Sequence, residues 1–161
     1  MKPPGLLALM LALASASGWA AVLKVTPQDS LQAAIARAQP GDTVQVGAGK
    51  YAGQFVIDKP LTIEGVGRPT ISGKGQGDVI RVRASDVTIR GLVLRDSGTD
   101  MGAQNAGIYI QPGSDRARIE NNFLVANLFG VWLEKSAGSR VTGNAITGRR
   151  DLQSAARGNG I

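Results

Sequence analysis

The chain has 161 residues, 22 of them glycine, with no cysteine and no histidine, and its formal net charge is +6 at neutral pH. The lack of both residue types excludes disulfides, and metal centres built on thiolate or imidazole, within this sequence. The basic balance is compatible with an acidic protein, an anionic polysaccharide or a membrane surface as partner. We expect no nucleic acid partner, because no nucleic-acid-binding module is recognisable.

Residues 1–20 predict a secretory signal peptide. Lys2 precedes an apolar run over 6–14, and small residues before Ala21 suit a cleavage site after Ala20. The run is shorter than the roughly 20 residues that cross a bilayer as a helix. We therefore expect a periplasmic mature chain, residues 21–161, without a transmembrane segment.

Residues 30–39 predict a single amphipathic helix. Its apolar positions repeat at helical spacing: Leu31, Ala34, Ile35 and Ala38. Asp29 or Ser30 can cap the first free N–H groups, and Pro40-Gly41 ends the helix. We interpret this helix as an N-terminal cap that covers the first coil of the repeat structure that follows.

The rest of the chain repeats itself. The segment 119–124 returns as 141–146, 22 residues later, and an earlier copy, 89–94, lies 30 residues before it. Likewise, 107–110 returns as 130–133 after 23 residues. Apolar and polar residues alternate within each copy, as in a strand. Short strands that recur once per coil predict an all-β parallel β-helix with coils of roughly 22–30 residues.

Further strand patterns fill the sequence before these copies. They cover 43–46, 55–57, 61–64, 70–71, 79–82 and 87–89, with glycine-rich or Pro-containing breakers between them. No linker or change in composition divides the chain, so residues 21–161 are predicted to form part of one domain.

Two insertions, 97–106 and 149–157, interrupt the coils, and each comes before a Gly-Ile strand start. We expect them to project from the same corner, two coils apart. Such loops often mark a binding face, although solenoid corners also tolerate insertions without a function. The sequence ends at Gly160-Ile161 within a strand pattern, which suggests a fragment whose C-terminal coil is left without a cap.

One outward-facing ladder is the candidate partner-binding surface. Alternation directs Arg81, Tyr109 and Trp132 away from the interior at matching positions of successive coils, which places a cation beside two stacked rings. Asp100 and Met101 of the first insertion complete the candidate set. The alternative is a purely structural aromatic stack.

Other polar residues suggest architecture. Asn121, Asn122 and Asn144 mark a corner where stacked amides would bond to one another and to the backbone, rather than act in catalysis. The strand arginines fit either a solvated outer face or an anion site: Arg81, Arg83, Arg90, Arg95, Arg116, Arg118 and Arg140. The carboxylates are scattered, so we assign no catalytic, cofactor-binding or metal-binding residue.

Several segments carry a resemblance to known families. The opening, with 30–35, Pro40-Gly41-Asp42-Thr43 and 58–63, resembles the right-handed parallel β-helix proteins of the pectate-lyase-like superfamily. The later part is similar to the periplasmic nitrous oxide reductase maturation family, in these segments: 90–98, 105–110, 121–123, 130–133 and 157–161. The resemblance covers the chain from about Val25 to the end.

This resemblance implies a non-enzymatic periplasmic accessory protein. Its partners would be nitrous oxide reductase and an inner-membrane ABC transporter, during assembly of a copper–sulfur centre. No cofactor is expected within this sequence, and copper ligands, if the full-length protein has them, would lie beyond Ile161. Two alternatives remain: a carbohydrate-binding or carbohydrate-active β-helix, such as a polysaccharide lyase, hydrolase or epimerase, and an adhesive solenoid without a dedicated site.

Overall fold

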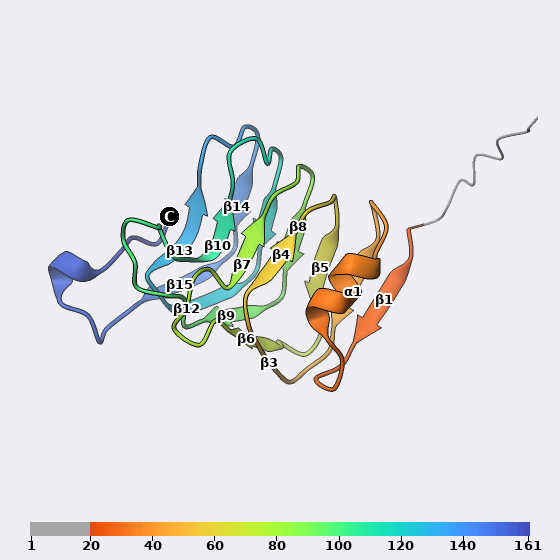
Figure 1. The fold of residues 1–161 in the computed structure, drawn as a ribbon, viewed down its shortest axis with the longest axis horizontal. Coiled ribbons are helices and arrows are strands. Elements are labelled where there is room, and N and C mark those ends of the chain that lie inside the picture. The colour runs from red at the N-terminus through yellow and green to blue at the C-terminus, as the bar shows by residue number, and fades with distance from the viewer. Residues whose placement is uncertain (1–19) are drawn as a thin grey trace, which may run out of the picture.

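A computed structural model describes residues 20–161, so the predicted signal peptide, apart from Ala20, lies outside the described residues. The chain winds into successive coils whose strands stack into three parallel sheets (Figure 1). The predicted all-β solenoid of parallel coils is confirmed.

Four central coils hold three strands each, while the first coil holds one strand and the last holds two. Sheet A holds β1 (Val22–Val25), β2 (Thr43–Val46), β5 (Thr62–Gly65), β8 (Thr88–Arg90), β11 (Arg118–Glu120) and β14 (Arg140–Thr142). Sheet B holds β3 (Lys50–Ala52), β6 (Thr70–Ser72), β9 (Val93–Arg95), β12 (Phe123–Asn127) and β15 (Ala145–Gly148). Sheet C holds β4 (Phe55–Ile57), β7 (Ile80–Val82), β10 (Ala106–Ile110) and β13 (Phe129–Leu133).

The stacking register matches the sequence repeats. In sheet A the inward residues Val44, Ile63, Ile89, Ile119 and Val141 form one column, so successive coils are 19, 26, 30 and 22 residues long. The first four of these side chains are at most 1% exposed. Burying one such aliphatic side chain contributes about 1.5–3 kcal/mol, so the shared interior is the main source of stability.

Helix α1 (Leu31–Arg37) covers the first coil on the side of sheet C (Figure 1). The Ser30 hydroxyl accepts a hydrogen bond from the Ala33 N–H at 3.2 Å, and Leu31 and Ile35 are buried. The Gln32 amide accepts from the Val56 N–H at 2.9 Å and donates to the Val56 carbonyl at 3.3 Å. A side chain thus satisfies the backbone edge of β4, as a neighbouring strand would.

The predicted cap is confirmed but is only half of the cap observed. Strand β1, which the sequence patterns did not reveal, pairs with β2 and covers the edge of sheet A. Asp42 holds both parts together, because its carboxylate accepts from the N–H groups of Ala21 and Gln39, each at 2.8 Å. These backbone hydrogen bonds lower the pKa of Asp42. Strand β3 was also missed.

Asparagines line two corners of the interior. Asn122 accepts from the Leu92 N–H at 3.1 Å and donates to the Ile89 carbonyl at 2.9 Å, and Asn144 repeats this role one coil later. The predicted architectural role is therefore confirmed for these two. Asn121 differs, since it is exposed and has a left-handed φ of +55°. Asn127, which the sequence analysis did not single out, forms a similar bridge at the next corner.

Between residues 20 and 161, no helix is long and apolar enough to span a membrane.

Candidate partner-binding face

The predicted ladder exists on the outer side of sheet C. Arg81 on β7 pairs in register with Tyr109 on β10, which pairs with Trp132 on β13. Val56 on β4 completes the column at the end near α1. The residues immediately before and after Tyr109, Ile108 and Ile110, are fully buried in the interior.

Arg81 is held by a buried aspartate. The Asp78 side chain is only 3% exposed, and its carboxylate accepts from the Arg81 guanidinium at 2.5 and 2.7 Å. Its other oxygen accepts from the Ala106 N–H at 2.9 Å. The guanidinium carbon lies 4.3 Å from the centre of the Tyr109 ring, which is a cation–π contact. Asp78 therefore fixes the orientation of Arg81 against the ring.

Tyr109 faces outward but is covered, with an exposed fraction of 6%. Its hydroxyl donates to the carboxylate of Glu134, just after β13. Burial, together with this hydrogen bond to a carboxylate, raises the pKa of Tyr109 to about 12. The ladder is thus a connected polar chain from Asp78 through Arg81 and Tyr109 to Glu134, with Tyr109 largely withdrawn from solvent.

Trp132 differs from the expectation of two stacked rings. Its ring contacts Phe129 of the same strand, with centroids 4.8 Å apart and planes tilted by 58°. Leu128 and Leu152 pack into the same cluster, which is separate from the main interior. Tyr109 belongs to this cluster as well, so its ring lies between these apolar side chains and Arg81. The indole Nε1 is buried and makes no hydrogen bond within the described part of the chain.

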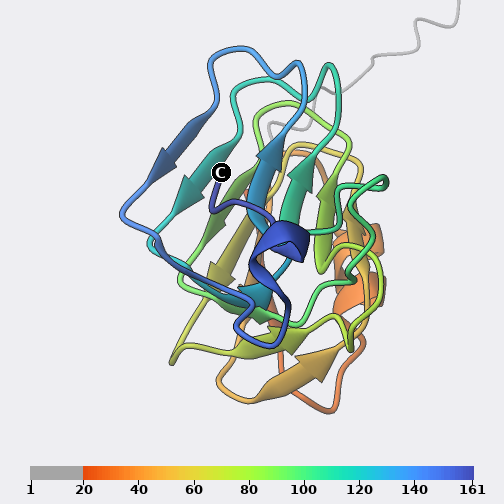
Figure 2. The same ribbon diagram turned by 90° about the vertical axis from the view of Figure 1, so that its left-hand side faces the viewer.

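Both insertions project from one corner beside this face, as predicted (Figure 2). The Arg149 guanidinium donates to the Ser97 carbonyl at 3.2 Å and joins the two loops. After the second loop the chain returns to sheet C, where the Val131 N–H donates to the Gly160 carbonyl at 2.9 Å. The loops therefore border the outer face of β10 and β13.

The first loop carries the remaining candidates. Asp100 closes the loop, because its carboxylate accepts from the Ala103 N–H at 3.1 Å and its own N–H donates to the Asn105 side chain at 3.1 Å. Met101, at the tip, is 46% exposed. Asp100 therefore shapes the loop, and Met101 offers an apolar contact beside the ladder.

Three residues of this face were missed: Asp78, Phe129 and Glu134. Their positions carried usable signals. Asp78 lies three residues before Arg81, and Glu134 lies two residues after Trp132 and thus continues the same outward alternation. Phe129 begins the strand that carries Trp132.

The available donors do not suit a copper site. Throughout residues 20–161, no group of three or more His, Cys, Asp or Glu side chains converges to hold a metal ion. The whole chain lacks His and Cys, and Met101 is the one sulfur ligand of the described part. We therefore derive no role for bound copper from these residues.

Comparison with known proteins identifies relatives. No protein-family model matches the chain. A protein of Stutzerimonas stutzeri, named "Probable ABC transporter binding protein NosD", is 36% identical over 114 residues, which are 71% of this chain and 26% of that protein. A protein of the same name from Pseudomonas aeruginosa is 34% identical over 138 residues, which are 80% of this chain and 32% of that protein. The chain thus spans about a quarter to a third of the length of these relatives. The sequence similarity and the stacked parallel coils together show that the chain is a relative of the NosD proteins.

Proposed function

We propose that this chain belongs to a periplasmic, non-enzymatic scaffold that acts with an inner-membrane ABC transporter during maturation of nitrous oxide reductase. The observation that carries the proposal is the similarity over 71–80% of the chain to proteins named as probable ABC transporter binding proteins. The predicted signal peptide supports export to the periplasm.

In this proposal the outer face of sheet C is the docking surface for a protein partner. Arg81 is oriented by Asp78, and the half-buried Trp132 offers ring surface. Arg and Trp are enriched among the residues that dominate binding energy at interfaces. The two joined loops flank this surface, and Met101 adds an exposed apolar side chain. In this proposal a partner's side chains pack between ladder and loops, against the exposed part of the Trp132 ring.

Copper enters the proposal as cargo of the maturation system and not as a group bound by this chain. The scaffold's task would then be to bring the transporter and the reductase together. Imidazole or thiolate ligands for copper would come from outside residues 1–161.

The test is capture of partners by the full chain from periplasmic extract of a denitrifying bacterium. We expect recovery of nitrous oxide reductase, and we expect Trp132→Ala to weaken capture at least about tenfold, as for an interface hot spot. Phe123→Ala is the matched control, because Phe123 is an aromatic residue that is 36% exposed on sheet B. Thermal unfolding of both variants verifies that they are folded.

Equal loss of capture in both variants would remove the outer face of sheet C from the proposal. Failure to recover either the reductase or transporter subunits would contradict the scaffold function itself. Depolymerisation of pectate or alginate by the full chain would support the carbohydrate-active alternative.

A further inference from the structure

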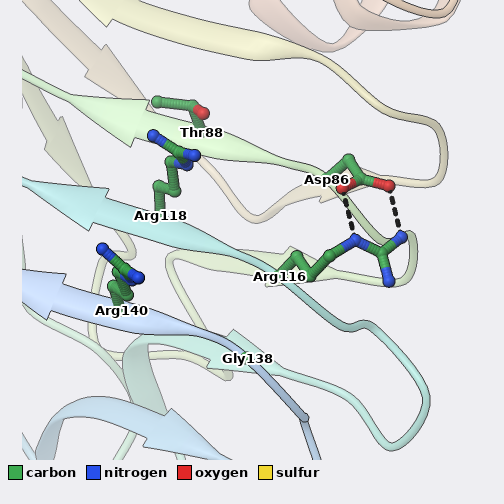
Figure 3. A pocket seen from close by; sticks show the side chains of 6 residues that line it. All are labelled: Asp86, Thr88, Arg116, Arg118, Gly138 and Arg140. Carbon is green, nitrogen blue, oxygen red and sulfur yellow. Dashed lines mark hydrogen bonds and ion pairs between the residues drawn. The ribbon is translucent and has the colours of Figure 1, made fainter.

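A second surface feature lies on sheet A, away from the face described above. Three arginines, Asp86, Thr88 and Gly138 line an open pocket of about 420 Å³ (Figure 3). The arginines are Arg116, Arg118 and Arg140. Their three positive charges, less the one of Asp86, leave the lining with a net charge of +2.

Arg118 and Arg140 occupy an unfavourable position relative to each other. They pair in register on the neighbouring strands β11 and β14, and Thr88 on β8 continues the column. Adjacent strands lie about 4.8 Å apart, and like charges placed directly opposite destabilise a sheet. Figure 3 shows both guanidinium groups on the same side of the sheet, one above the other.

Other arginines avoid this conflict by pairing with carboxylates. Arg90 pairs with Glu64 at 2.8 Å on the same sheet, and Arg81, Arg95 and Arg149 also have carboxylate partners. Within residues 20–161, neither Arg118 nor Arg140 takes part in an ion pair. An anion that sits between them would replace repulsion by two attractive contacts.

The third arginine is already fixed. The Arg116 guanidinium donates to both carboxylate oxygens of Asp86, at 2.7 and 2.6 Å, and this pairing lowers the pKa of Asp86. Both residues have left-handed φ angles, +56° and +60°, and stack at one corner of neighbouring coils. The Asp86–Arg116 pair lines one end of the pocket, and the column that begins with Thr88 lines the opposite end.

We propose that this pocket binds the phosphate group of a phosphate monoester. Guanidinium groups bind phosphate through paired, charge-assisted hydrogen bonds, and a monoester carries close to two negative charges and three acceptor oxygens. That charge balances the +2 of the lining, whereas a carboxylate would balance only half of it. The volume leaves room for an organic group beyond the phosphate.

The surroundings favour a discrete ligand over a broad membrane contact. The next column on the same face of sheet A carries Glu64, Arg90 and Glu120, and its net charge is −1. The positive charge is thus not spread over the whole face, as contact with an anionic bilayer would need. This inference does not rest on the proposed scaffold function.

The test is an NMR titration of the full chain, in which the arginine Nε–H signals are followed. Inorganic phosphate and glycerol 3-phosphate are compared with chloride at constant ionic strength. We expect saturable shifts of the Arg118 and Arg140 signals with glycerol 3-phosphate, and a matching response to inorganic phosphate would identify free phosphate as a second source. Vesicles with phosphatidic acid, compared with vesicles of phosphatidylglycerol, test a lipid as the source.

Variants test the assignment to these residues. Arg118→Gln and Arg140→Gln should each weaken phosphate binding at least about tenfold, the effect of losing a charge-assisted hydrogen bond. Arg118→Lys retains the charge and should lose less phosphate affinity than Arg118→Gln. Lys24→Gln is the control, because it removes one charge from the exposed end of the same sheet. A hexaglutamate peptide serves as a probe for an acidic protein ligand. The proposal would be overturned by shifts that chloride reproduces or that persist in Arg118→Gln. Shifts that appear only with the hexaglutamate peptide would overturn it as well.

Discussion

At the scale of single residues, Tyr109 combines an outward position with burial. Its ring lies under the Arg81 guanidinium and its hydroxyl donates to Glu134. Alternation predicted the direction of this side chain correctly, because direction follows from the pleat of the strand. It could not predict the burial, because the Arg81 guanidinium, Glu134 and the apolar side chains of Leu128 and Phe129 come together around Tyr109 only after the coils are stacked.

The raised pKa of Tyr109 predicts a loss of stability in alkali. The folded state keeps the phenol protonated up to a pH of about 12, whereas the unfolded chain releases the proton near pH 10. Between these values the unfolded state binds fewer protons, so the free energy of unfolding falls as the pH rises. Urea denaturation at pH 8 to 11.5 should show this fall.

In the variant Tyr109→Phe, the free energy of unfolding should fall less steeply with rising pH than in the wild type. A remaining slope is expected from Tyr51, whose pKa is raised mainly by burial and additionally by the charge of Asp29. An unchanged slope in Tyr109→Phe would contradict the assignment. A spectroscopic titration of phenolate absorbance in wild type and variant measures the same pKa directly.

At the scale of elements, sequence periodicity predicted one part of the N-terminal cap, helix α1, and missed the other, strand β1. Helix α1 was predicted because four apolar residues repeat at helical spacing and Ser30 precedes them. Strand β1 was missed because it directly follows the apolar N-terminal segment of the sequence, and its side chains show no clean alternation. Its place is determined by β2, to which it pairs along its whole length.

The hydrogen bonds of Gln32 indicate how the cap prevents self-association of the protein through the edge of sheet C. Because it satisfies both the N–H and the carbonyl of Val56, Gln32→Ala leaves the edge of β4 open. We expect a loss of about 1–2 kcal/mol in the free energy of unfolding and increased self-association through this edge. Denaturation together with light scattering measures both effects.

Gln39→Ala is the control, because the Gln39 side chain donates only to the Arg37 carbonyl at 3.4 Å, at the far end of the helix. Equal self-association of the two variants would show that Gln32 does not protect the edge.

At the scale of the whole molecule, one interior joins nearly all the coils. A single cluster of buried residues extends from Val25 to Val131. The sequence predicted this stacking because its repeats bring like residues into register. The sequence analysis placed Tyr109 and Trp132 on one face but missed the apolar cluster that joins them to Phe129, since Leu152 reaches this cluster from an insertion outside the repeats.

Ile89→Ala should therefore destabilise the molecule as a unit. Ile89 is fully buried in a central coil, and its truncation leaves a cavity that costs about 2–5 kcal/mol. Amide hydrogen exchange should report faster exchange in all three sheets. Ile146→Ala, in the last coil and only partly buried, is the comparison and should affect mainly β12 and β15. Faster exchange confined to β8 in Ile89→Ala would indicate independent coils.

The unequal coil lengths, from 19 to 30 residues, have a practical consequence. Every change in length is absorbed at a corner, while the columns of sheet A stay aligned. A peptide grafted between Gly98 and Asn105 should accordingly leave the spacing of Arg81 and Tyr109 unchanged. The fold would thus serve as a display framework, in which the loops that border sheet C can be exchanged without disturbing the strands beneath them.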